Sequence, residues 1–326
     1  MGLKLLTKKR NRTIKMAICG LGRFAEKRLL PAIQNVDGIE LVAVVANKIE
    51  NINISPKIEK FTNLDDMLKS KDLDVVHIST PNSLHYKQTL ECFKHSKDVI
   101  CEKPLSTTFK NAKNMLSMAK LEKCHLLVAH MLRASPAILR IKEIIESGYV
   151  GALLKIKIEL NYNVDPILRK WLWNSKIAGG GCVIDSGVHC IDVAQFLTEK
   201  DWTLSKKNLK KNEYDIETNA KIILSSKAVK CEININSNTS YSSSLEIIGE
   251  ECTILVNNFS ASWGSSEFEF LDNDKKVFNK FFVDVSSVYK NQYDNFFKIL
   301  SKRDFNHSVT NDAIKSLKII EEIYHL

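Results

Sequence analysis

The feature that most constrains the fold is an apolar strand that runs directly into a glycine-rich turn. Lys15–Cys19 is the predicted strand, Gly20-Leu21-Gly22-Arg23-Phe24-Ala25 is the turn, and we expect a helix to follow as far as about Asn35. Glycines at this point allow a tight turn and let the backbone approach a pyrophosphate at the N-terminus of the helix. This unit predicts a dinucleotide site, to which we assign Gly20, Gly22, Arg23 and Phe24.

The strand and turn begin a series in which apolar strands alternate with helices. Further strands are predicted at residues 40–46, 74–80, 98–101 and 125–130. Alternation with short joints indicates a doubly wound parallel sheet, whose ligands bind beyond the carboxyl ends of the strands. Two more segments lie at that edge, Thr80–His85 and Glu102–Pro104. The cofactor-binding residues predicted there are Thr80, Pro81, Asn82, His85, Glu102 and Lys103.

The end of the second strand bears on the choice of cofactor. An acidic residue that binds the adenosine ribose is expected there, about 20 residues after the glycines. The sequence instead reads Ala46-Asn47-Lys48. Asn47 removes the repulsion of a 2′-phosphate and Lys48 offers it a positive partner, so we predict a binding site for NADP or NAD with NADP slightly favoured. The alternative is that Lys48 points to solvent and Asn47 bonds either ribose.

From Arg133 onwards the pattern changes. A helix at 136–147 and a strand at 153–161 precede short strands at 220–224, 229–235, 244–248, 252–256, 268–271 and 277–283, and helices at 289–301 and 311–324 close the chain. These strands predict an open, mostly antiparallel sheet, with a Ser/Asn-rich loop at 236–244. We divide the chain into a basic tail at 1–14, a cofactor domain at 15–132 and an α+β domain at 133–326.

One stretch of the second domain lacks an ordinary solvated face. Gly179-Gly180-Gly181 predicts a turn, the following helix runs to about Leu197, and residues 177–198 contain no Lys, Arg or Glu. Residues three and four apart share a helix face, so Asp185, His189 and Asp192 form one stripe. We interpret it as an acid/base helix beside a substrate pocket. The alternative is a core helix whose His and Asp satisfy each other; a metal is not predicted, because no third ligand is obvious.

Composition limits the partners. The 326 residues are 44% hydrophobic with a formal charge of +9, and the densest basic clusters, at 8–12 and 206–211, contain no interleaved aromatics. We therefore expect no nucleic acid. No run has transmembrane length and the first residues lack the apolar core of a signal peptide, so we expect no membrane. Eight cysteines without a Cys-x-x-Cys pair favour buried free thiols and a cytoplasmic protein.

Taken together, the motifs resemble the glucose–fructose oxidoreductase / inositol dehydrogenase / rhizopine-catabolism (Gfo/Idh/MocA) family. The resemblance runs from about Lys15 to the C-terminus and rests on the order and spacing of the motifs: Gly20-x-Gly22-x-x-Ala25, Thr80-Pro81-Asn82-x-x-His85, Glu102-Lys103-Pro104, Arg133 with Pro136, Gly148 and Gly151, and Gly179-Gly180-Gly181 with Asp185-x-Gly187-x-His189-x-x-Asp192. It implies an α/β protein with an N-terminal Rossmann domain and a C-terminal α+β domain. The sheet of the latter commonly forms the oligomer interface, so a homodimer or homotetramer is expected.

The resemblance implies a catalytic trio of Lys103, Asp185 and His189 and a sugar-like substrate. His189 suits proton transfer near neutral pH, and Lys103 would stabilise charge on the reacting oxygen. Asp185 would orient the imidazole or a substrate hydroxyl. The predicted substrate-binding residues are Arg133, Trp171, Asp185 and His189.

Three functions follow from this interpretation. The first is an NAD(P)-dependent oxidoreductase that acts on a sugar, nucleotide sugar or cyclitol. The second is a glycoside hydrolase that uses a bound nicotinamide for transient oxidation. The third is a non-catalytic, cofactor-binding regulator, against which the retention of Lys103, Asp185 and His189 argues. A many-stranded sheet with few helices also predicts an uncovered apolar face that a second subunit covers.

Overall fold

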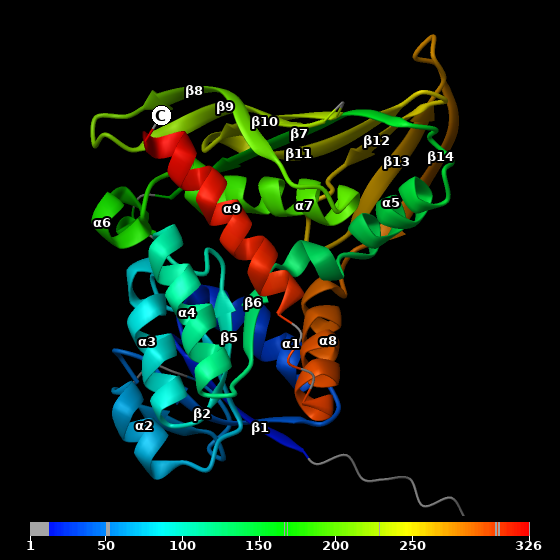
Figure 1. The fold of residues 1–326 in the computed structure, drawn as a ribbon. Coiled ribbons are helices and arrows are strands. Elements are labelled where there is room, and N and C mark those ends of the chain that lie inside the picture. The colour runs from blue at the N-terminus through cyan, green and yellow to red at the C-terminus, as the bar shows by residue number, and fades with distance from the viewer. Residues whose placement is uncertain are drawn as a thin grey trace, which may run out of the picture.

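The chain folds into two sheets that lie one above the other in Figure 1, with helix α9 (Ser308–His325) running between them. This computed structural model describes residues 13–49, 53–165, 167, 169–227, 229–303, 305 and 307–325. Most of the basic tail predicted at 1–14 therefore lies outside the described residues. Its last residue, Ile14, belongs to the first strand rather than to a tail.

The first sheet is a six-stranded parallel sheet in the order β3-β2-β1-β4-β5-β6. Its strands are β1 (Ile14–Cys19), β2 (Ile39–Val45), β3 (Glu59–Phe61), β4 (Val75–Ile78), β5 (Asp98–Glu102) and β6 (Leu126–Ala129), and its helices are α1 (Leu30–Gln34), which continues a π-helical turn at Ala25–Leu29, α2 (Leu64–Ser70), α3 (Asn82–Lys94) and α4 (Phe109–Leu121). The predicted doubly wound parallel sheet is confirmed. Both β3 and α2 were missed, because they are short and mostly exposed.

Strand β1 shows why this sheet needs helices on both faces. Met16 and Ile18 pack into one apolar cluster with Tyr293 of helix α8 (Val288–Lys302), whereas Ala17 and Cys19 pack into the other. Alternate residues are thus apolar in both directions, as a strand buried on both faces requires. Helix α8 covers this sheet although it follows the second domain in sequence (Figure 1).

The second sheet has eight strands in the order β14-β13-β12-β11-β7-β10-β9-β8. Their bounds are β7 (Leu153–Asn163), β8 (Thr203–Lys211), β9 (Glu217–Ser226), β10 (Val229–Asn236), β11 (Asn238–Gly249), β12 (Thr253–Asn257), β13 (Ser265–Leu271) and β14 (Val277–Asp284). Every pairing is antiparallel except that of β10 with β7. The predicted open, mostly antiparallel sheet is confirmed.

Two segments of this sheet differ from the prediction. The Ser/Asn-rich stretch 236–244 is not a loop, because β11 begins at Asn238 and pairs with β7 and β12. The lysine-rich cluster at 206–211 lies in edge strand β8, where no strand was predicted. Lysines suit an edge strand, since their charges oppose pairing with another chain. Lys207 also donates to the carbonyl of Ile323 at 2.6 Å, near the end of α9.

In Figure 1, helices α5 (Pro136–Glu146), α7 (Val188–Thr198) and α9 cover one face of the second sheet and leave the other open. The open face is not the apolar surface we expected. Strand residues that alternate with the buried ones form cross-strand ion pairs: Lys155–Glu232 (2.6 Å), Lys157–Glu246 (2.7 Å), Lys280–Glu267 (2.6 Å) and Lys280–Glu269 (3.0 Å). Exposed Phe278 and Phe282 of β14 lie on the same side of this strand as Lys280, so the open face is mixed rather than wholly apolar. The homo-oligomer stays a prediction.

The eight cysteines are all buried and free, as predicted. One described stretch, Ser175–Thr198, is apolar and long enough to cross a membrane, but 78% of its apolar segment is buried inside the protein. In this fold it contains the core helix α7.

Candidate active site

The glycine turn after β1 has one closed side and one open side. Gly20 has a φ of +100°, and a Cβ there would lie 2.7 Å from the backbone nitrogen of Thr80. A Cβ on Gly22 would meet no atom within 4 Å. The helix begins at Arg23, and Arg23 and Phe24 are exposed. The turn therefore presents a helix N-terminus and an uncovered backbone, which are the features a pyrophosphate needs.

The end of β2 is open as well. Asn47 and Lys48 follow this strand, and both are exposed. Neither side chain has a hydrogen-bond or ion-pair partner among the residues that the structure describes. No acid occupies the ribose position, so a 2′-phosphate would meet no fixed negative charge from these two residues.

Of the residues predicted at the next strand end, three have structural contacts. The hydroxyl of Thr80 donates to Oε1 of Gln88 at 2.5 Å. The Nδ2 amide of Asn82 donates to the carbonyl of Ala178 at 2.8 Å, which ties α3 to the second domain. The ring of His85 is buried, with Nδ1 2.9 Å from the carbonyl oxygen of Pro104 and Nε2 2.9 Å from that of Thr80. No ring nitrogen is left for a cofactor, so the predicted contact of His85 is corrected: it joins the loops after β4 and β5. Pro81 immediately precedes α3.

Glu102 ends β5 beside a buried polar pair. Its Oε1 lies 3.4 Å from His77 Nε2, and His77 Nδ1 lies 2.7 Å from the hydroxyl of Tyr293. The Glu102 side chain is only 12% exposed. The Glu102 carboxylate thus lies against His77 inside the first domain, one residue before Lys103.

The helix predicted to carry acid/base residues exists, with one irregular turn. The short helix α6 (Ser175–Ala178) ends at Gly179, which has a φ of +87°, and the turn Val183–Gly187 is π-helical before α7 begins at Val188. Single π-helical turns are frequent at functional sites. Asp185 lies in this turn and His189 lies on the first turn of α7.

Asp185 is buried and is held by cations and a phenol. Arg169 donates to both carboxylate oxygens, at 2.9 and 3.2 Å, and the Tyr162 hydroxyl donates to Oδ2 at 3.3 Å. Burial alone would raise the pKa of this carboxyl, but Arg169 and then Lys103 outweigh it and hold the pKa well below its usual range. Asp185 is therefore a permanent anion, and the structure shows no hydrogen bond from it to His189.

Lys103 reaches across from the first domain to this helix. Its Nζ donates to the backbone oxygen of Asp185 at 2.7 Å and lies 3.6 Å from Oδ1 of the same residue. The ammonium has three donors. The side chain keeps 18% of its surface exposed, so the remaining donors face the space between the domains.

His189 has one enclosed and one accessible ring nitrogen. Nδ1 is buried and has no hydrogen-bond partner among the described residues, whereas Nε2 is not enclosed. Burial, then Lys103 and His130, lower the pKa of His189 well below its usual value, and Asp185 opposes them. The imidazole is neutral near neutral pH and can accept a proton at Nε2. No hydrogen bond joins Asp185 and His189 in the described residues, which argues against the alternative that the two merely satisfy each other.

Asp192, the third member of the stripe, has a different role. Arg133 donates to both of its carboxylate oxygens, at 2.7 to 3.1 Å, and also to Asp312 at 2.9 Å. His130 Nδ1 lies 3.5 Å from Asp192, and its ring meets that of His189 edge to face with centroids 6.2 Å apart. Arg133 is a predicted substrate-binding residue. In this structure its guanidinium forms hydrogen bonds to the carboxylates of Asp192 and Asp312.

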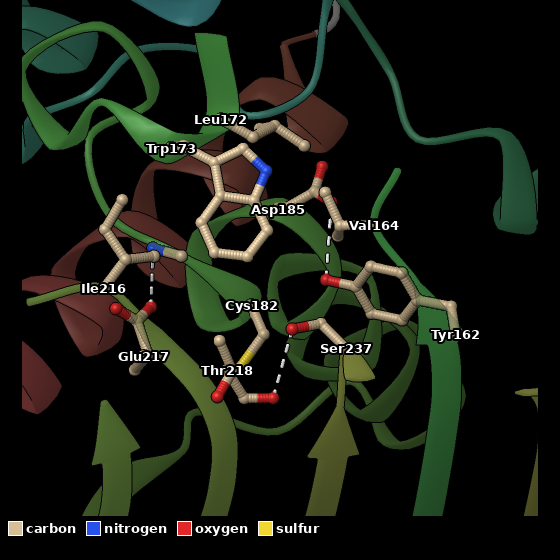
Figure 2. Close-up of a pocket in the computed structure, with 11 residues that line it drawn as sticks. Tyr162, Val164, Leu172, Trp173, Cys182, Asp185, Ile216, Glu217, Thr218 and Ser237 are labelled. Atoms are coloured by element: carbon tan, nitrogen blue, oxygen red, sulfur yellow. Dashed lines mark hydrogen bonds between the residues drawn. The ribbon is translucent and has the colours of Figure 1, made fainter. Parts of the chain in front are cut away.

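A pocket of about 290 Å³ opens on the other side of Asp185. Figure 2 shows the indole of Trp173 and the side chain of Tyr162 facing it from opposite sides, with Asp185 between them. The remaining lining residues come from the glycine turn, the loop after β7 and the ends of β9 and β10: Val164, Leu172, Gly181, Cys182, Ile216, Glu217, Thr218 and Ser237. Trp173 Nε1 is enclosed without a partner among the described residues. Trp171, the predicted substrate contact, does not line this pocket and lies against Arg169, whose guanidinium is 5.9 Å from the ring centre.

Fold and site together define a two-domain protein with a Rossmann domain, in which Lys103 of the first domain contacts Asp185 in the turn before the helix of His189. A model of the oxidoreductase family with an NAD-binding Rossmann fold matches residues 14–130, and a model of the GFO/IDH/MocA C-terminal domain matches residues 138–255. The two cover more than half of the chain. The protein therefore belongs to the Gfo/Idh/MocA family of NAD(P)-dependent oxidoreductases, as the motifs predicted.

Relatives of known activity include sugar dehydrogenases. A D-xylose 1-dehydrogenase [NADP(+)] of Haloarcula marismortui is 25% identical over 58% of this chain and 55% of its own length. A levoglucosan dehydrogenase of Pseudarthrobacter phenanthrenivorans is 33% identical over 40% of this chain and 34% of its own. The chain spans about half the length of the curated relatives it matches.

Solved structures show the same fold over nearly the whole chain. A 3-ketoreductase from Actinomadura kijaniata in complex with NADP and TDP-benzene superimposes with a TM-score of 0.87, at 16% identity, over 96% of this chain and 97% of the other. An aldose-aldose oxidoreductase from Caulobacter crescentus gives 0.85 at 19% identity, over 96% and 97%. At these identities the likeness establishes the fold alone.

Proposed function

We propose that the protein transfers hydride between a nicotinamide cofactor and a carbinol or ketone carbon of a sugar-like substrate. The observation that carries this proposal is the meeting of Lys103 and His189. Lys103 follows β5 at the cofactor edge of the first sheet, and its ammonium is anchored on the backbone of Asp185 in the helix that carries His189. Proton transfer and charge stabilisation are thereby available at one place between the two domains.

In the oxidative direction Nε2 of His189 would accept the proton of the substrate hydroxyl, at the carbon from which a bound nicotinamide would accept a hydride. His189 suits this step because its pKa is held low, which keeps the imidazole neutral and ready to accept a proton. Lys103 donates a hydrogen bond to the reacting oxygen and stabilises the negative charge that develops there. In the reductive direction the same groups return the proton to the oxygen.

Asp185 cannot take that proton, because Arg169, Tyr162 and Lys103 all favour its ionised form. It holds Lys103 near the reacting oxygen and offers acceptor capacity to a substrate hydroxyl. The resemblance implies that Asp185 orients the imidazole or a substrate hydroxyl. The first role has no support in the geometry, because no N–H of His189 donates to the Asp185 carboxylate in the described residues.

The residues present fit a dinucleotide. The open side of Gly22 and the start of the helix at Arg23 suit the pyrophosphate, and exposed Asn47 and Lys48 suit the ribose or its 2′-phosphate. When bound, the cofactor supplies the hydride acceptor or donor. The chain's own part is to place the cofactor's reactive ring at the edge where Lys103 lies.

The pocket beside Asp185 is our candidate for the non-reacting part of the substrate. The pocket is small and partly open to solvent, so it would hold only part of a substrate. An aromatic face from Trp173 and an unpartnered indole N–H suit a hydroxylated ring. Among the described residues, the lining contains Asp185 and Glu217 and no lysine or arginine, so an anionic group is disfavoured there.

The test is turnover of free sugars, cyclitols and nucleotide sugars with NADP(H) or NAD(H), read by nicotinamide absorbance. His189→Ala should lower turnover by at least about 10²-fold, with the dissociation constant of the cofactor unchanged. His95→Ala, a partly exposed histidine near Asp65 and Glu91, serves as the control. Conversion of a substrate without net change in nicotinamide would favour the hydrolase instead, and a His189→Ala protein that turns over normally would refute the assignment.

A further inference from the structure

The glycine turn before the catalytic helix is held by two buried side chains that take no part in the proposed proton transfer, although Glu217 also lines the candidate substrate pocket. Glu217, the first residue of β9, is 3% exposed, and its Oε1 accepts from the N–H groups of Gly181 at 2.7 Å and Val183 at 3.2 Å. Tyr324, on the last turn of α9, donates its hydroxyl to the same oxygen at 2.6 Å. That hydroxyl also accepts from the N–H of Ile184 at 3.2 Å.

The glycines of the turn are required by these contacts. A Cβ on Gly180 would lie 2.1 Å from the Tyr324 hydroxyl oxygen, and Gly180 has a φ of +151°. A Cβ on Gly181 would lie 2.2 Å from the backbone oxygen of Glu217. Any side chain at either position would displace the carboxylate or the phenol. The turn and its two partners therefore form one packed unit, which we call the Glu217–Tyr324 clamp.

The Glu217–Tyr324 clamp supplies hydrogen-bond acceptors to the N–H groups at the N-terminus of the helix. The first N–H groups of a helix have no partner within the helix, and a negative charge is stabilised there. Here the carboxylate and phenol bind the N–H groups of Gly181, Val183 and Ile184, the residues directly before Asp185. The N–H of Asp185 in turn donates to the carbonyl of Gly181 at 3.0 Å. A buried carboxylate that accepts three hydrogen bonds is well compensated for its loss of water.

We infer that Glu217 and Tyr324 are positioning residues, which fix the start of the π-helical turn and so place Asp185 and His189 against Lys103. The inference rests on the proposed function. Both residues are distant in sequence from the turn, by 36 and 140 residues. Their effect passes through the backbone, because neither hydrogen-bonds to the side chain of Asp185 or His189 in the described structure.

The experiment compares Glu217→Ala, Glu217→Gln and Tyr324→Phe in the full chain. Misplacement of a catalytic group by about 1 Å can cost about 10²-fold in rate, so we expect Glu217→Ala to lower kcat by about 10²-fold with the dissociation constant of the cofactor unchanged. Glu217→Gln should recover most of kcat, because its amide oxygen accepts the same N–H bonds. Hydrogen exchange should accelerate in residues 179–187 of Glu217→Ala and Tyr324→Phe.

The matched control is Thr310→Val, which removes a buried hydroxyl that donates to Leu126 at 2.5 Å from the same helix α9. It should lower the melting temperature without lowering kcat or changing exchange at 179–187. The inference is overturned if Glu217→Ala keeps kcat within about threefold, or if Thr310→Val loses as much kcat at an equal loss of melting temperature. If Glu217→Ala does not fold, Tyr324→Phe decides, and unchanged hydrogen exchange at residues 179–187 in that variant overturns the inference. Failure of the proposed function is separable, since Lys103→Ala and His189→Ala would then remain active.

Discussion

Removal of the Lys103 ammonium tests the cleft most directly, because two measurable quantities respond. Its Nζ lies 2.7 Å from the backbone oxygen of Asp185 and 3.6 Å from the carboxylate, which aims its remaining donors at the space between the domains. Loss of one preorganised donor to a reacting oxygen costs about 10²–10³-fold in kcat, or about 2.7–4 kcal/mol. We expect Lys103→Ala to lower kcat by this factor while the dissociation constant of the cofactor changes little.

The second response is a shift in the pH profile. Burial, then Lys103 and His130, lower the pKa of His189. When Lys103 is removed, the positive charge of its ammonium no longer opposes protonation of His189, so the pKa of His189 rises. In the oxidative direction the neutral imidazole is the active form, so the acid limb of kcat/KM should move to higher pH. A profile that stays in place or moves to lower pH would refute the electrostatic link between these two residues.

Lys97 provides the matched control at the opposite end of β5. Its Nζ donates to the backbone oxygen of Leu73 at 2.9 Å, so Lys97→Ala loses a similar bond away from the cleft. Loss of a hydrogen bond to a charged group costs about 1.5–3 kcal/mol of stability, and both variants should melt lower. If Lys103→Ala shows only this loss, with kcat within about threefold of the parent, the reasoning is wrong.

Three further outcomes are expected. Burial lowers the pKa of three histidines, His85, His130 and His189. Their stabilisation is complete above the usual value near 6.5 and is lost as the pH falls below it, by up to about 1.4 kcal/mol per pH unit for each; chemical denaturation that shows no loss of stability below pH 6 would contradict this. Fluorescence titration should show that Lys48→Ala weakens binding of NADPH more than that of NADH, and equal or tighter binding of NADH by the parent would contradict the preference. Gly22→Ala should keep its melting temperature but bind the cofactor more weakly, since its Cβ meets only the space left for the pyrophosphate; unchanged cofactor binding would place the pyrophosphate elsewhere.

The parallel sheet was predictable because its signals are local. Residues 16–19 of β1 are apolar on both faces of the strand, and the glycines follow directly after them. The apolar run predicts a buried strand, and the glycines predict where it ends. Strand β8 and the first half of β11 lack such a signal and were missed. Strand β8 carries lysines because it lies at an edge, and β11 begins in a Ser/Asn-rich stretch that is exposed. In both, the neighbouring strand rather than the residue pattern determines the structure.

The site was predictable only in part, for a related reason. Asp185 and His189 lie four residues apart on one helix, so a local rule finds them. Their partners come from other elements: Arg169 from the loop after β7, Tyr162 from the end of β7, and Glu217 from β9. Whether an arginine meets an aspartate 16 residues away depends on how that loop packs, which no local period records. The sequence offers only a weak signal for these partners, namely that each is a polar residue at or near the end of a strand.

The division of labour between Asp185 and His189 follows from those distant partners. Two titratable groups acquire separate roles when their surroundings move their pKa values apart. Arg169 and Lys103 hold the pKa of Asp185 low against the effect of burial, and burial with Lys103 also lowers that of His189. Lys103 contributes to both shifts, after Arg169 for the carboxyl and after burial for the imidazole. Because Lys103 comes from the first domain, its part of each shift depends on the packing of the two domains.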